Sequence, residues 1–148
     1  MAKQNQGNSL AMLRMTGDLA GQIKADMILL VAESGLNRAV LQKLNDQCQV
    51  LVVTRNSRFL QGVEELGIRR LQFDFDVDDV SYFERVRQGI ILGMEGGYIQ
   101  KGNRLVCLVN LMQRRGVDTL VMVDTSQGFE GFDPESVAAL AGDLSIEV

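Results

Sequence analysis

Arginine and hydroxyl side chains follow three apolar runs of the sequence, at positions where an anion could be bound. Residues 27–32, 49–54 and 105–109 are continuous apolar runs, typical of buried strands in a parallel sheet. In such a sheet the segments after the strands emerge at one edge. The candidate ligand-binding residues there are Ser34, Gly35, Asn37, Arg38, Thr54, Arg55, Asn56, Ser57, Arg58, Arg114 and Arg115. Guanidinium groups and helix-start amides suit phosphate or carboxylate groups, so the pattern predicts an anion site. The alternative is that these arginines are solvated loop residues.

The sequence offers no recognisable catalytic group. It contains no histidine, which excludes Ser-His-Asp triads, histidine metal sites and a histidine pH switch. Ser34 has no visible general base partner, so we predict no catalytic residue and no cofactor. Cys48 and Cys107 lie far apart, in or beside apolar runs and without a CxxC motif. We expect both to be buried and reduced, and not to form a metal site or a redox pair.

Two further motifs have simpler structural explanations. Residues 74–79 begin like a calcium-binding loop, but Asp79 and Arg85 stand where that loop requires glycine and glutamate. Carboxylates near a helix start are favoured by the helix dipole, so we predict no metal site. The glycine-rich residues 93–97 come at an expected helix end and therefore do not indicate a nucleotide-binding loop.

Length and charge narrow the class of protein. The 148 residues correspond to one domain, and 46% hydrophobic residues suffice for a single core. The net charge of -4 argues against nucleic-acid binding by this domain. No apolar run approaches the roughly 20 residues that span a bilayer, and the polar first residues do not resemble a signal peptide. We therefore expect a cytoplasmic protein that does not enter a membrane.

Apolar periodicity predicts helices alternating with strands. The first helix is expected over about residues 9–25 with a cap at Ser9, and the second over about 36–44 with a cap at Ser34. A third helix is capped by Asn56 or Ser57 and closed by Gly67, and a fourth runs over about residues 81–96 from a capping box. An apolar stripe on the first helix is expected to pack in the core; it consists of Met12, Met15, Leu19 and Ile23.

The last two strands define the fold class. Residues 105–109 and 117–123 are separated by too few residues for a parallel crossover, so they should form an antiparallel hairpin. Residues 68–75 alternate in polarity, as an edge strand would. The prediction is an α/β fold, a three-layer α/β/α sandwich over residues 9–125, with a mostly parallel five-stranded sheet and an antiparallel edge strand. Residues 1–8 should be frayed, and residues 126–148 should form a connector with a short helix leading to a downstream domain.

The last strand, residues 117–123, is apolar and lies at a predicted sheet edge. Natural edges of this kind are usually covered, and a symmetric partner is one way to cover them. We therefore expect a homo-oligomer; the alternative is that the C-terminal segment of the same chain covers the edge.

Four short segments resemble the C-terminal α/β domain of pyruvate kinase, over about residues 10–125. They are residues 33–35, 53–56, 101–106 and 116–120, in matching order and spacing. The resemblance implies the same sandwich fold, association through the last part of the fold, and no catalytic residues. In many members a loop after the first strand binds the phosphate of a sugar-phosphate effector, which implies the same role for Ser34 and Gly35. Residues 36–38 depart from that loop, which carries a basic residue and a further hydroxyl in the family.

A second resemblance involves the C-terminal part of the chain. Stand-alone copies of this domain occur at the N-terminus of certain diadenylate cyclases, which make cyclic di-AMP, and residues 104–148 resemble the lead-in to such a cyclase domain. The Asp-Gly-Ala and Arg-His-Arg motifs of the cyclases are absent from this chain. The resemblance therefore implies a non-catalytic regulatory or assembly domain that binds a phosphorylated or anionic metabolite. The alternatives are a small enzyme or binding protein acting on a phosphorylated small molecule, and a domain that serves assembly alone.

Overall fold

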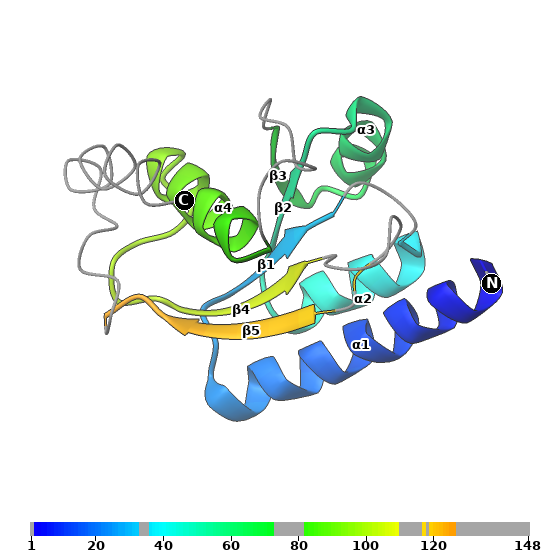
Figure 1. Ribbon diagram of the computed structural model, residues 1–148, viewed down its shortest axis with the longest axis horizontal. Coiled ribbons are helices and arrows are strands. Elements are labelled where there is room, and N and C mark those ends of the chain that lie inside the picture. Colours follow the sequence, from blue (N-terminus) through cyan, green and yellow to red (C-terminus); the bar gives the residue numbers. More distant parts are fainter. Residues whose placement is uncertain (1, 33–35, 73–81, 110–116, 118, 127–148) are drawn as a thin grey trace.

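The computed structural model of the chain describes residues 2–32, 36–72, 82–109, 117 and 119–126. Helices and strands alternate along these residues until the last two strands, which come in succession (Figure 1). The elements are α1 (Ala2–Ile23), β1 (Met27–Val31), α2 (Arg38–Gln47), β2 (Val50–Thr54), α3 (Ser57–Glu65), β3 (Arg69–Gln72), α4 (Tyr82–Glu95), β4 (Arg104–Val109) and β5 (Thr119–Asp124).

The strands form one sheet of five, in the order β3-β2-β1-β4-β5. β1 pairs in parallel with β2 and with β4, β2 pairs in parallel with β3, and β4 pairs antiparallel with β5. Every residue of β1 and β2 is buried, because these central strands are covered on both faces. The predicted mostly parallel sheet, its edge strand β3 and its antiparallel hairpin are all confirmed.

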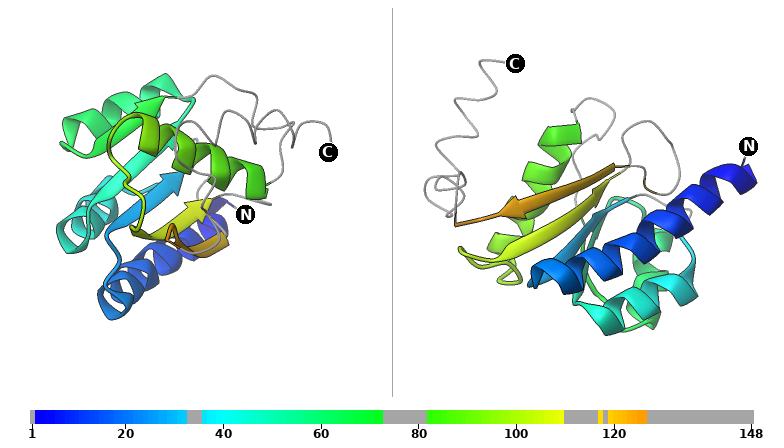
Figure 2. Two further views of the ribbon diagram at one scale, coloured as in Figure 1. Left: turned by 90° about the vertical axis from the view of Figure 1, so that its left-hand side faces the viewer. Right: turned by 90° about the horizontal axis from the view of Figure 1, so that it is seen from below.

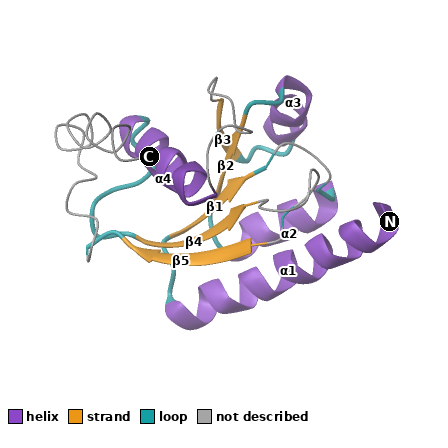
Figure 3. Ribbon diagram, in the orientation of Figure 1, coloured by secondary structure: helices purple, strands orange, loops and turns teal. Residues whose placement is uncertain are grey.

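Helices cover both faces of the sheet, which gives three layers (Figure 2). Successive side chains of a strand point to opposite faces. On β1, Ile28 and Leu30 therefore join a core with α1, α2 and α3, whereas Leu29 and Val31 join a core with α4. α4 crosses the second face, with α1 and α2 beneath the first (Figure 3). It packs closely at Gly89, where a Cβ would lie 3.1 Å from Cγ2 of Val31.

The first helix starts earlier than expected. α1 begins at Ala2, so the prediction of a cap at Ser9 is wrong. The fraying expected for residues 1–8 stays a prediction. α1 ends at Ile23 and is followed by Lys24, whose positive φ of 55° turns the chain toward β1.

The buried face of α1 also differs from the expected one. Leu13 and Ala20 are buried against the sheet, whereas Met15 is 68% exposed. The prediction that the whole methionine stripe packs in the core is therefore wrong at Met15. The small residues Gly17 and Ala20 let the helix approach its neighbours closely. Met12, Leu19 and Ile23 are partly buried and pack against the same core, as predicted.

Candidate functional site

The carboxyl ends of β1, β2 and β4 lie at one edge of the sheet, because these strands are parallel neighbours. Val31 is level with Val53 on one side and with Val109 on the other. The chain passes from β1 to β2, whereas β4 lies on the opposite side of β1, so the strand order reverses between β1 and β4. Open α/β sheets bind ligands at such a switch point.

Four of the predicted binding residues belong to the segments that follow β1 and β4. These residues are Ser34, Gly35, Arg114 and Arg115, and all four lie outside the described residues, as does the acidic stretch 74–79. Their role in binding stays a prediction.

The two helix starts at this edge are capped by asparagines. Asn37 accepts a hydrogen bond from the amide of Val40 through Oδ1, at 3.1 Å, and α2 therefore begins at Arg38. The prediction that Ser34 caps this helix is wrong, because the helix starts after Asn37. Asn56 caps α3, since its Oδ1 accepts from the amides of Arg58 and Phe59 at 3.0 and 3.3 Å. This confirms the predicted cap at Asn56.

Thr54 also forms a hydrogen bond with the backbone at this edge. Its side chain is fully buried, and its Oγ1 accepts a hydrogen bond from the amide of Asn56 at 3.1 Å. Together with the caps, this bond fixes the turn from β2 into α3. Asn37, Thr54 and Asn56 therefore shape the edge through their hydrogen bonds to the backbone.

Arg38 forms an ion pair with Glu65 on α3, which could not be predicted from the sequence. Its Nη1 donates to Oε2 of Glu65 at 3.0 Å, and both side chains are exposed. The guanidinium lies over Gly62, where a Cβ would come within 2.7 Å of Nη2. Gly62 thus makes room for Arg38, and an anion at the edge would have to compete with Glu65 for this arginine.

Arg55 and Arg58 are the exposed cations that follow β2. The amide of Gln72, at the end of β3, donates to the carbonyl of Arg55 and to Oγ of Ser57, each at 3.4 Å. The contact of Gln72 with this loop was not predicted from the sequence, because Gln72 lies on another strand. The parallel pairing of β2 with β3 places it beside the loop. Two guanidinium groups beside a helix start suit a phosphate or carboxylate.

The cysteines provide no activated thiol at this edge. Both are free; Cys107 is buried and Cys48 is half-buried, so the expectation of full burial holds for Cys107 alone. Burial raises the pKa of the Cys107 thiol to about 12. Burial, and then the charge of Asp26, also raise the pKa of Cys48. Because the thiolate is the reactive form, neither cysteine is prepared for nucleophilic chemistry near neutral pH.

The chain is thus a three-layer α/β domain with a mostly parallel sheet, and the exposed Arg55 and Arg58 follow the carboxyl end of β2. Residues 8–128 match a protein family described as the probable sensor domain DacZ_P, and the chain therefore belongs to this family. A search of curated proteins found no match. Among the helices that the structure describes, none has the length and apolar character needed to cross a membrane.

Proposed function

We propose that this chain is a non-catalytic sensor domain that binds a phosphorylated or other anionic metabolite at the carboxyl edge of its sheet. The observation that carries the proposal is the match to a probable sensor domain over residues 8–128. The edge supports it, because Arg55 and Arg58 flank the start of α3 beside the switch point.

The regulated activity in this proposal is diadenylate cyclase activity, carried by a separate domain of the same cytoplasmic protein. The support is the resemblance of residues 104–148 to the lead-in of a cyclase domain, and the absence of the cyclase motifs from this chain. The mostly parallel sheet with an antiparallel last strand is also the architecture that a pyruvate kinase C-terminal-like domain implies.

The proposal includes self-association through β5, because the two edges of the sheet differ in chemistry. β3 carries Arg69 and Arg70, charged residues of the kind that protect natural edges from pairing. β5 carries only apolar residues between Thr119 and Asp124, and Met122 is 59% exposed. A second copy of the chain, related by a two-fold axis, would cover this edge.

A thermal-shift screen combined with a turnover assay tests the proposed function. The chain is heated with inorganic phosphate and with a panel of phosphorylated metabolites, and each compound that stabilises it is then incubated with it to detect product. We expect stabilisation without turnover. Turnover would identify a small enzyme instead, and no stabilisation by any anion would remove the sensing proposal.

A further inference from the structure

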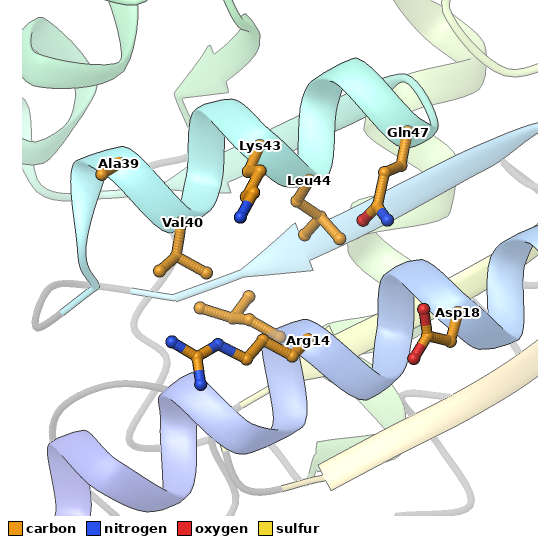
Figure 4. Close-up of a pocket in the computed structure, with 8 residues that line it drawn as sticks. Arg14, Asp18, Ala39, Val40, Lys43, Leu44 and Gln47 are labelled. Carbon is orange, nitrogen blue, oxygen red and sulfur yellow. The ribbon is translucent and has the colours of Figure 1, made fainter.

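A groove lies between α1 and α2, and none of the residues that line it belongs to the predicted anion site at the carboxyl edge (Figure 4). Its volume is about 320 Å³, at the lower end of the range of small-molecule sites, which is roughly 300–1,000 Å³. Its floor is apolar and includes Leu13, Val40 and Leu44. Leu13 and Leu44 are buried in the core shared with the sheet, so the floor rests on the rigid part of the fold.

Close contact at Gly17 shapes this groove. A Cβ at Gly17 would overlap Oε1 of Gln47 and would lie 3.3 Å from Cδ1 of Leu44. The two helices therefore touch near the end of α2. One turn earlier along α1, Arg14 faces Val40 and Lys43 across the groove (Figure 4).

The charges around the groove are unbalanced. The guanidinium of Arg14 and the ammonium of Lys43 lie on either side of Val40, whereas Asp18 lies farther along, beneath Gln47 (Figure 4). Within the described part of the chain neither cation forms an ion pair, although Asp18 is only one turn from Arg14. Arg38 and Arg70, by contrast, are paired with Glu65 and Glu64. Two cations on one groove without a carboxylate between them favour an anionic guest.

We propose that this groove binds a small organic anion with an aliphatic body. A carboxylate or phosphate group would accept hydrogen bonds from Arg14 and Lys43, while the aliphatic part would cover Leu13, Val40 and Leu44. The bound anion joins the side of α1 to the first half of α2, the helix that begins at the carboxyl edge. It would therefore hold these two helices together. This groove is a different site from the proposed anion site at the carboxyl edge, and binding in the groove does not depend on a ligand at that edge.

The test uses hexanoate as the probe and hexanamide as its neutral isostere. Each compound is titrated into the isotopically labelled chain, and backbone amide shifts are followed by NMR. We expect hexanoate to shift amides of α1 and α2 around Arg14 and Lys43, with a Kd in roughly the millimolar range for so small a ligand. Hexanamide should produce much smaller shifts, because it lacks the charge. Equal binding of both compounds would overturn the proposal, since the groove would then be merely apolar.

Variants distinguish binding in this groove from binding at the carboxyl edge. Arg14→Gln with Lys43→Gln should weaken hexanoate binding by about tenfold, since exposed charge pairs contribute modestly each. Ala39→Phe should block the groove without removing a charge, because Ala39 is exposed and lines it. Lys101→Gln, a control in a distant exposed turn, and Arg55→Gln with Arg58→Gln should leave binding unchanged. The assignment would be overturned if the Arg14 and Lys43 variant bound hexanoate with unchanged affinity, or if the Arg55 and Arg58 variant lost hexanoate binding.

Discussion

At the residue scale, several polar side chains of the candidate edge turn out to serve the backbone. Asn37 and Asn56 were predicted from the sequence as ligand-binding residues, and the structure places their side-chain oxygens on helix-start amides. The cap could be predicted to lie at Asn56 or Ser57, because both residue types favour helix starts and both come shortly after an apolar strand. The pairing of Arg38 with Glu65 could not, because it depends on how α2 and α3 lie beside each other.

Two glycines on different helices should respond to alanine in opposite ways. Gly93→Ala places a Cβ against the Cδ1 of Ile99 and 3.2 Å from Leu51 Cδ2, inside the α4 core. Overpacking costs more than the gain in helix propensity, so we expect a net loss of about 1 kcal/mol. Gly21→Ala meets nothing within 4 Å and should stabilise the chain by up to about 1 kcal/mol. Urea unfolding measures both, and equal effects would contradict the close packing at Gly93.

Cys107 should make the chain less stable at alkaline pH. Burial raises its pKa from 9.0 to about 12, so the unfolded chain loses the thiol proton first as the pH rises. The folded state binds more protons between these values, and stability therefore falls with pH in that interval. From pH 8 to pH 10 the wild type should lose about 1 kcal/mol more than Cys107→Ala, since one pKa unit corresponds to about 1.4 kcal/mol. Parallel unfolding curves for the two proteins would contradict this.

At the element scale, the central strands and the first helix were predicted from the sequence, but the start of that helix and the exposure of Met15 were not. The runs of β1 and β2 are apolar apart from Thr54, which is typical of strands covered on both faces. α1 carries two apolar stripes, and the sequence favoured the one with larger side chains. The structure buries the stripe with Gly17 and Ala20 more deeply, because small residues allow closer packing, while Met12, Leu19 and Ile23 pack against the same core as partly buried residues.

Two substitutions of Asn56 should separate its role as the cap of α3 from anion binding. Asn56→Ala leaves the amides of Arg58 and Phe59 without their acceptor and should cost about 1 kcal/mol of stability. Asn56→Asp should retain the cap and the stability, but the carboxylate beside Arg55 and Arg58 should weaken anion binding. Gln61→Ala, an exposed position of the same helix, is the control. Urea unfolding and calorimetry separate the two effects; if Asn56→Ala is as stable as the control, the cap contributes nothing.

At the scale of the whole molecule, topology was more predictable than the site. The length of each connection decides whether neighbouring strands run parallel or antiparallel, and this can be counted in a sequence. The site depends on which strand ends are neighbours, and this cannot be counted in the sequence. Gln72, for example, contacts Ser57 because β2 pairs with β3.

Self-association should depend on the β5 edge. Met122→Lys places a charge on an exposed apolar edge and should convert the dimer to a monomer at tens of micromolar, as measured by sedimentation velocity. Met15→Lys makes the same change at another exposed methionine, on α1, and should leave the dimer intact. Dissociation by Met15→Lys alone would place the contact on α1 instead, and a monomeric wild type would refute self-association.

Isothermal titration calorimetry with the stabilising phosphorylated metabolite tests whether the carboxyl edge binds the anion. The wild type should release or absorb heat on binding, and Arg55→Gln with Arg58→Gln should weaken the affinity by at least about tenfold, because two charge-assisted hydrogen bonds are removed. Lys101→Gln should bind as the wild type does. If the double variant binds with unchanged affinity, the carboxyl edge is not where the metabolite is sensed.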